Sequence, residues 1–167
     1  MNEITVLLRL LVAAGLGAIV GYERERAHKI AGLRTHALVS LGAALFAIIS
    51  TNAFSEYLGK TTYDPSRVVS NIVVGIGFIG AGAVLKQGKI VTGTTTAATL
   101  WIVGAIGAAV GLGMIFPAVF AAAIAYAILI VLTLIVKRVH SEERHHIPIH
   151  GEYLEEGIEE KEKGHQD

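Results

Sequence analysis

The chain has 167 residues, of which 53% are hydrophobic and only 17% are charged, and its formal net charge at pH 7 is zero. Soluble domains carry closer to about a quarter charged residues, and a neutral chain has no bulk charge that would attract nucleic acid. The composition therefore argues against a soluble enzyme and against a nucleic-acid-binding protein. The chain has no cysteine, which excludes disulfides and thiolate chemistry.

The uncharged residues gather in tracts long enough to cross a bilayer. A hydrocarbon core of about 30 Å needs roughly 20 apolar residues in a helix, and lipid offers the backbone no hydrogen-bond partner. We therefore predict an all-α integral membrane protein, a bundle of five transmembrane helices in residues 1–137, followed by a short cytoplasmic tail in residues 138–167. The predicted spans are residues 4–22, 36–54, 65–85, 96–113 and 116–136.

The first predicted span contains a charged residue, Arg9, near its start. A charged side chain inside lipid costs at least about 2.5 kcal/mol on insertion scales. We therefore expect Arg9 either to reach the headgroups or to pair with Asp64 or Glu3. Gly17 and Gly21 follow at four-residue spacing, which is typical of close helix packing.

Polar residues follow the first span and precede the second. If the helix continues, Glu25 and Lys29 are spaced to pair with each other, as are Arg24 and His28. The polar residues of this region that we consider candidates for a site are Glu23, Arg24, Glu25, Arg34, Thr35 and His36.

The third predicted span begins at Pro65, which suits the first helical position and follows Asp64 as the capping residue. Arg67 and Asn71 share a face, and with Arg9 and Asp64 they form an expected polar cluster on the outer side. The glycines of this span either pack against other helices or let the helix bend to line a cavity, as in transporters. They are Gly75, Gly77, Gly80 and Gly82.

The fourth span follows a run of threonines. We expect Thr94, Thr95 and Thr96 to cap this helix and its positive end to attract Glu23 or Glu25. The turn signal at residues 111–117 predicts a tight hairpin between the fourth and fifth spans. One stripe of the fourth span carries three more packing glycines, Gly104, Gly107 and Gly111.

The tail combines histidines with an acidic run at residues 152–162. Four imidazoles in eleven residues could bind zinc or another divalent ion, but without a fixed scaffold they are more often an exposed polar tail. The sequence leaves this open, and we expect no cofactor. The weak metal candidates are His140, His145, His146 and His150.

Lysine and arginine gather after the first and third spans and at the start of the tail. The positive-inside rule then predicts an outer N-terminus and a cytoplasmic C-terminus. Under this topology the candidate residues around Glu23 and His36 join Thr95 and Thr96 at the cytoplasmic surface. There they either fix the topology and clamp the bundle, or bind an ion, a lipid headgroup or a partner protein.

Four motifs in order resemble the MgtC/SapB family of bacterial membrane proteins. Residues 64–67 also resemble the family's approach to its third helix. The four motifs, within residues 9–113, are Gly21-Tyr22-Glu23-Arg24-Glu25, Ala31-Gly32-Leu33-Arg34-Thr35-His36, the glycine-rich run from Gly75 to Gly82, and the run from Thr95 to Trp101.

The resemblance implies a multi-pass protein of the bacterial cytoplasmic membrane, linked to growth under magnesium limitation and to survival inside macrophages. It implies a regulator of partners such as the proton-translocating ATP synthase, rather than a magnesium carrier. Relatives with a full regulatory region carry a cytoplasmic ACT-like domain, for which the roughly 30 residues after the last span are too short. Relatives also commonly read Gly-Leu-Thr-Thr where Thr94 here follows Gly93.

Three classes of function remain to be compared. We expect a non-enzymatic regulator or interaction module that contacts the bilayer and either a second copy or another membrane protein, such as an ATP synthase or transporter. The alternative is a transporter or channel for a divalent cation or small solute, favoured by the glycine-rich third span and by Glu23 and Glu25. An enzyme has little support, because the sequence offers no serine–histidine–acid set and no carboxylates paired across a cleft.

Overall fold

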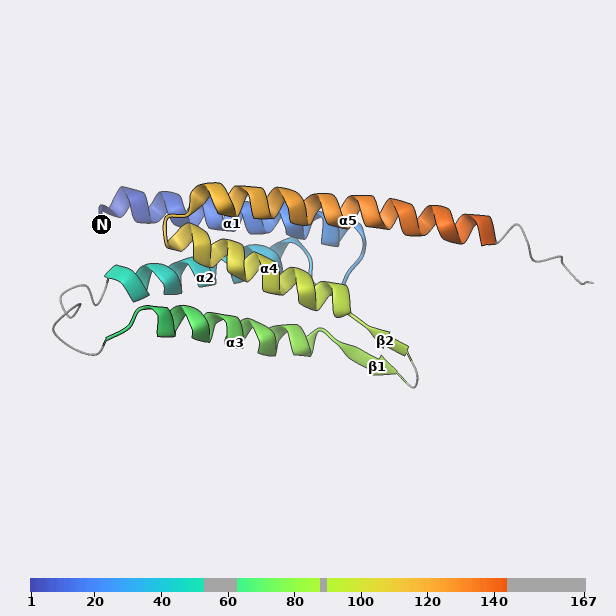
Figure 1. Ribbon diagram of the computed structural model, residues 1–167, viewed down its shortest axis with the longest axis horizontal. Coiled ribbons are helices and arrows are strands. Elements are labelled where there is room, and N and C mark those ends of the chain that lie inside the picture. Colours follow the sequence, from blue (N-terminus) through green and yellow to red (C-terminus); the bar gives the residue numbers. More distant parts are fainter. Residues whose placement is uncertain (53–62, 88–89, 144–167) are drawn as a thin grey trace, which may run out of the picture. The chain divides into compact units, whose positions relative to one another are not determined.

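The computed structural model describes residues 1–52, 63–87 and 90–143, which form five helices and one β-hairpin (Figure 1). The chain divides into two compact units, Met1–Ile130 and Val131–Asp167, and the helical bundle belongs to the first. The elements are α1 (Glu3–Arg26), α2 (Leu33–Asn52), α3 (Ser66–Gly82), β1 (Leu85–Gln87), β2 (Ile90–Thr92), α4 (Thr94–Gly111) and α5 (Ile115–Glu143).

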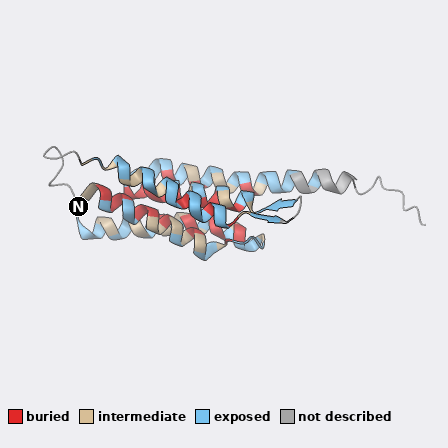
Figure 2. Ribbon diagram, turned by 90° about the horizontal axis from the view of Figure 1, so that it is seen from below, coloured by how far each residue is buried: buried red, intermediate tan, exposed pale blue. Residues whose placement is uncertain are grey.

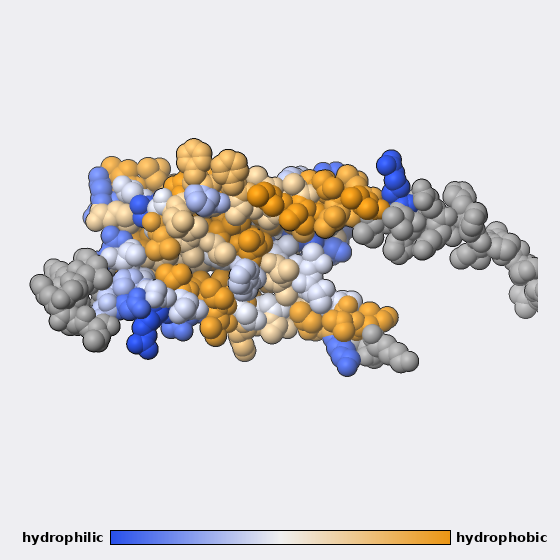
Figure 3. Space-filling model, in the orientation of Figure 1, coloured by the Kyte–Doolittle hydropathy of each residue, from blue (hydrophilic) through white to orange (hydrophobic). Residues whose placement is uncertain are grey.

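The helices have the length and surface of a membrane protein, which confirms the predicted helical fold class. Helices α1, α2, α4 and α5 are long and apolar enough to cross a bilayer. Helix α3 is apolar but has only 17 residues, about 25 Å at 1.5 Å per residue. Large apolar side chains such as Leu7, Ile19 and Phe116 are exposed. Figure 3 shows hydrophobic residues along the sides of the helices, where lipid would contact them.

Helix α4 lies at the centre of the bundle and α3 at its edge. Ten of the 18 residues of α4 are buried, but only two of the 17 in α3, and the buried positions follow the inner faces of the helices (Figure 2). Helix α4 packs against α1, α2 and α3. The main core cluster is built largely from small side chains, so the helices approach one another closely. It contains Ala13, Ala44, Ile106, Val110, Ala118 and Ala122.

The segment between α3 and α4 differs from the expectation of a helix to residue 85. Helix α3 ends at Gly82, and β1 and β2 pair in antiparallel fashion, with Leu85 opposite Thr92. The chain leaves this hairpin through Gly93, which has φ 85° and immediately precedes α4. A Cβ at Gly93 would collide with the carbonyl oxygen of Ala83. Glycine is therefore required there both for the backbone angle and for space.

The turn between α4 and α5 is the tight one predicted. Only three residues separate Gly111 from Ile115, and Gly113 among them has φ 88°. Helix α5 continues to Glu143, beyond the expected end at residue 136. It therefore includes His140 in its backbone, whereas His145, His146, His150 and the acidic run lie outside the described residues.

Candidate functional site

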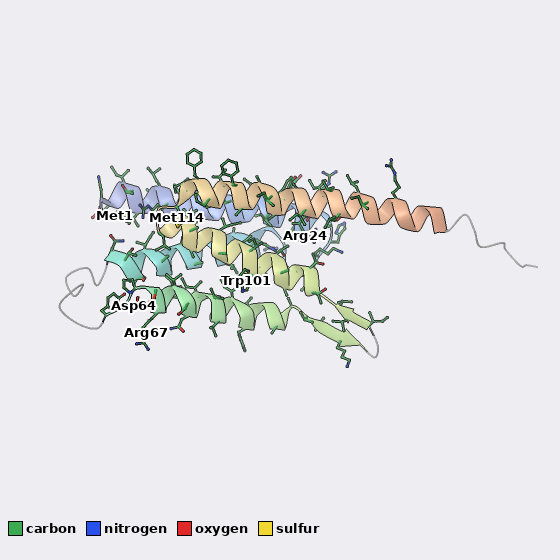
Figure 4. The ribbon with its side chains drawn as sticks, in the orientation of Figure 1. Met1, Arg24, Asp64, Arg67, Trp101 and Met114 are labelled. Atoms are coloured by element: carbon green, nitrogen blue, oxygen red, sulfur yellow. The ribbon has the colours of Figure 1, made fainter. Side chains whose placement is uncertain are left out.

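One end of the bundle carries most of the residues singled out in the sequence. The end of α1, the start of α2, the hairpin and the start of α4 lie together there (Figure 1). Figure 4 shows Arg24 near this end, whereas Met1, Asp64 and Arg67 lie at the other. We call it the Arg24 end, formed by residues 23–36 and 93–99.

Arg24 is buried together with its own neighbour in sequence. Its side chain is only 3% exposed, and its Nε and Nη2 both contact Oε2 of Glu23, which is 12% exposed. Burial of a charge requires such a partner. The expected Arg24–His28 pair is not made among the described residues. Helix α1 ends at Arg26, and His28 has a left-handed φ of 51°, so the helical spacing no longer applies.

Glu25 closes the turn between α1 and α2. Its Oε2 accepts a hydrogen bond from the backbone N–H of Leu33, the first residue of α2, at 2.9 Å. This carboxylate therefore caps α2, and the expectation that it would pair with Lys29 is wrong. No side-chain hydrogen bond from Glu23 or Glu25 caps α4 among the described residues. A Cβ at Gly32 would collide with the same Oε2, so the cap also requires a glycine there.

The start of α4 is not capped as predicted. Its N-cap is Gly93, and no side-chain hydrogen bond caps the helix among the described residues. Thr95 is exposed. Thr96 is only 3% exposed, and its backbone carbonyl oxygen lies 2.8 Å from Oγ1 of Thr99. Thr96 thus belongs to the interior of the bundle rather than to a cap.

His36 joins α2 to α4 at this end. Its ring is fully buried, with Nδ1 2.8 Å from the carbonyl oxygen of Gly32 and Nε2 3.0 Å from Oγ1 of Thr99. A carbonyl only accepts, so Nδ1 carries a proton. With a neutral ring the Thr99 hydroxyl donates to Nε2, and with a charged ring it donates to the carbonyl of Thr96. Of the other candidates of this motif, Arg34 is exposed and Thr35 is half-buried.

Ser40, which was not predicted as a site residue, lies where three helices pack closely together. Its hydroxyl donates to the carbonyl of Ala13 in α1 at 2.7 Å. A Cβ at Gly17 of α1 would lie 2.7 Å from Cβ of Ser40, and one at Gly107 of α4 would collide with the Ser40 carbonyl. The sequence signal was available: His36, Ser40 and Ala44 recur every four residues along α2.

The remaining glycines singled out in the sequence divide into two groups. An added Cβ would be too close to Leu33 at Gly21, to Ile76 at Gly104 and to Ala44 at Gly111, and at Gly80 it would make ordinary contact with Ala97. By contrast, no described atom lies within 4 Å of an added Cβ at the other three, which are Gly75, Gly77 and Gly82.

At the other end, Arg9 does not pair with either acidic residue proposed for it. Its Nη1 donates to the carbonyl oxygen of Gly111 at 2.8 Å, where a cation stabilises the negative end of α4. In the described chain it forms no ion pair with Glu3 or Asp64. An added Cβ at Gly113 would lie 2.7 Å from Nη2 of Arg9, so the turn glycine also makes room for the guanidinium.

The rest of the expected outer cluster gathers at the start of α3. The Asp64 carboxylate accepts from the backbone N–H of Ser66 at 2.9 Å. Hydrogen bonds from the Ser66 side chain and backbone, with a smaller contribution from Arg67, hold the pKa of Asp64 below its ordinary value. Asn71 lines a groove between α2 and α3. The expected cluster is therefore two separate features, Arg9 at the end of α4 and Asp64–Arg67 at the start of α3.

The metal-binding hypothesis concerns the tail. Within the described residues, no three histidines, cysteines or carboxylates are placed to hold a metal ion. The side chain of His140 and all of His145, His146 and His150 are outside that description. Metal binding by these histidines stays a prediction.

Comparison with known proteins identifies the family. A family model described as MgtC family matches residues 10–138. The Escherichia coli K12 protein named "Putative magnesium transporter YhiD" is 44% identical over 110 residues, which cover 65% of this chain and 51% of that protein. Protein MgtC of Salmonella typhimurium LT2 is 40% identical over 146 residues, 87% of this chain and 58% of the relative.

Uncharacterized protein slr0014 of Synechocystis is similarly related, with 40% identity over 149 residues that cover 89% of this chain and 59% of the relative. The chain thus spans between one half and three fifths of the length of these curated relatives. No solved structure matches it. With the family model covering most of the bundle, this chain is a membrane protein that belongs to the MgtC family.

Proposed function

We propose that this chain is a non-enzymatic regulator or interaction module that acts through lateral contacts with another membrane protein during adaptation to magnesium limitation. The observation that carries the proposal is the use of polar groups inside the bundle. Every buried side-chain nitrogen and oxygen in the described residues has a hydrogen-bond partner. Arg24, Glu25 and His36 each bind a neighbouring group of the chain. Polar side chains that already bind other groups of the chain are not available to line an ion path, so they favour a structural role at this end.

Helix α3 offers the lateral surface for such contacts. Most of it is exposed, with Val74 71% and Phe78 83% accessible. Gly77 lies on this exposed part, with no described atom near an added Cβ. Small residues let a second helix approach closely in lipid, where apolar burial alone gives little driving force. The partner is a second copy or another membrane protein, such as an ATP synthase or transporter.

A transporter or channel for a divalent cation is the second candidate, and it is favoured by the name of the relative YhiD, a putative magnesium transporter. A pathway of this kind needs polar groups near the middle of the membrane. The groove between α3 and α4 is lined instead by apolar side chains, among them Val69, Val73 and Ala105.

Two measurements on the same chain separate these functions. In a strain that lacks its own MgtC-family protein, we expect the chain to restore growth in low magnesium. We expect Gly77→Leu to remove at least half of that effect without lowering the amount in the membrane. Gly15→Leu is the matched control, because Gly15 of α1 is also exposed with no described atom within 4 Å of an added Cβ. In sealed vesicles loaded with a magnesium-sensitive dye, we expect no uptake above protein-free vesicles.

Magnesium uptake that depends on the reconstituted chain would instead establish the transporter. Equal growth with Gly77→Leu and Gly15→Leu would remove α3 as the contact surface.

We also propose that the chain crosses the cytoplasmic membrane several times, with the Arg24 end inside. The support is that Arg24, Arg26, Lys29 and Arg34 gather at this end. Because the chain has no cysteine, single cysteines report sidedness. A membrane-impermeant maleimide should label Arg67→Cys in intact cells but Arg26→Cys only after permeabilisation. The reverse pattern would invert the topology.

A further inference from the structure

An apolar groove runs between α2 and α3. It encloses about 720 Å³ and is lined mainly by apolar residues of both helices, including Leu38, Phe46, Ile72 and Ile79. Arg34 and Thr35 also line it, at the α2 turn that belongs to the Arg24 end. An apolar groove on the side of a membrane helix bundle faces lipid rather than water, so a hydrocarbon chain is a suitable occupant.

A second, polar hollow adjoins the groove. It measures about 410 Å³ and is lined by residues of the α1–α2 turn, including His28, Lys29 and Arg34. Arg34 and Thr35 line both spaces. The carboxylate in the hollow, Glu25, is already bound to the start of α2. Neither Lys29 nor Arg34 has an ion-pair partner among the described residues, so the hollow presents free cations to a ligand.

The groove is long enough to hold an acyl chain. Eleven positions separate Thr35 from Phe46 along α2, which is about 17 Å at 1.5 Å per residue. Half of a hydrocarbon core of about 30 Å is close to this length. An acyl chain whose headgroup sits at Arg34 would therefore extend along the groove toward Asn71 and Val68 of α3.

Two glycines line the groove at positions where no contact within the described chain requires the absence of a side chain. Gly42 of α2 and Gly75 of α3 line it, and no described atom lies within 4 Å of an added Cβ at either position. Glycine weakens a helix relative to alanine. Its presence on both walls is accounted for if an occupant lies directly against the helix backbones.

We propose that the groove and the hollow together bind one anionic phospholipid. Its acyl chain lies between α2 and α3, and its phosphate accepts hydrogen bonds from Arg34, with Lys29 and His28 nearby. A guanidinium matches phosphate oxygens in a bidentate arrangement, and basic pockets between transmembrane helices recognise anionic headgroups. The unpaired cations select an anionic lipid, such as phosphatidylglycerol, over zwitterionic phosphatidylcholine.

Fluorescence quenching by brominated lipids tests the proposal. The single tryptophan, Trp101, lines the groove between α3 and α4 instead, so the reporter chain carries Trp101→Phe together with Phe46→Trp. It is reconstituted in phosphatidylcholine vesicles that contain a fixed fraction of phosphatidylglycerol, with bromine on the acyl chains of one lipid or the other. At equal fractions of brominated lipid, brominated phosphatidylglycerol should quench the new indole more strongly.

Adding Arg34→Gln should lower the preference for phosphatidylglycerol by about fivefold, the value of one basic residue near a lipid surface. Arg26→Gln is the matched control, because it makes the same change at the same end but lines neither space; it should leave the preference intact. Gly42→Leu fills the groove without changing charge and should reduce quenching by both lipids at unchanged helicity. Equal quenching by the two lipids, equal loss in the two arginine variants, or quenching by neither lipid because a second copy covers the groove would each overturn the proposal.

Discussion

Replacing Gly107 by alanine is expected to lower the free energy of unfolding by about 1–3 kcal/mol, the usual effect of overpacking, and leucine is expected to prevent assembly of the bundle. A Cβ at Gly107 would collide with the backbone carbonyl of Ser40, and a backbone atom cannot rotate away as a side chain can. Helix α2 is also packed tightly against α1, where a Cβ at Gly17 would be 2.6 Å from the carbonyl oxygen of His36, so it has little room to adjust.

The measurement is equilibrium unfolding of the purified protein in dodecyl maltoside micelles by titration with sodium dodecyl sulfate, followed by far-UV circular dichroism. Gly77→Ala and Gly77→Leu are the matched controls, because that glycine has open space around it, and they should unfold no more easily than the parent. The destabilisation by Gly104→Ala should be larger than at Gly77 and smaller than at Gly107, since a Cβ at Gly104 would meet the flexible side chain of Ile76. Equal destabilisation at Gly77 and Gly107 would show that the crossing with α2 does not set the effect, because helix propensity alone favours alanine over glycine at both positions.

The number and approximate bounds of the helices were predictable because apolar tracts of bilayer length have few alternatives in lipid. The turn around Gly113 was predictable for a similar local reason, since glycine and proline mark it in the sequence. The pairing of β1 with β2 was not predictable. Leu85, Ile90 and Val91 are apolar and adjoin the third apolar tract, so the pattern alone gave no reason to separate them from the end of the helix.

The partners of the charged residues could not be read from spacing. Pairing of Glu25 with Lys29 assumed a helix that continues past Arg26, but α1 ends there. Arg9 binds a backbone carbonyl 102 positions away. No sequence pattern indicates that a side chain will bind a backbone carbonyl so far along the chain. Spacing also could not distinguish Gly107, which meets a neighbouring helix, from Gly77, which meets none.

The family motifs are far apart in the sequence, but hydrogen bonds join three of them in the fold. The first motif reaches the second through Glu25 and the N–H of Leu33, and the second reaches the last through His36 and Thr99. Segments separated by more than 60 positions thus form one bonded layer at the Arg24 end. This layer fixes how α1, α2 and α4 meet, which is why its charged residues belong to the stability of the bundle as well as to its surface.

The buried ion pair of this layer gives the second large effect. Glu23→Gln should lower the free energy of unfolding by about 3–5 kcal/mol, the usual result when one partner of a buried pair is removed. The reason is that Arg24, only 3% exposed, would keep its charge and lose the carboxylate that both its Nε and Nη2 contact. Unfolding in dodecyl maltoside, as for Gly107, measures the change.

A double-mutant cycle separates the loss of a pair from the loss of a side chain. Arg24→Met removes the buried cation, so Glu23→Gln added to it should have little further effect, and the two changes should be far from additive. Glu25→Gln is the matched control, because it makes the same chemical change two positions away. Glu25 is exposed, and the amide oxygen of glutamine can still accept the hydrogen bond from Leu33. This variant should lower the free energy of unfolding by at most about 1 kcal/mol. Additive effects of Glu23→Gln and Arg24→Met would contradict a buried pair, because each side chain would then contribute without the other.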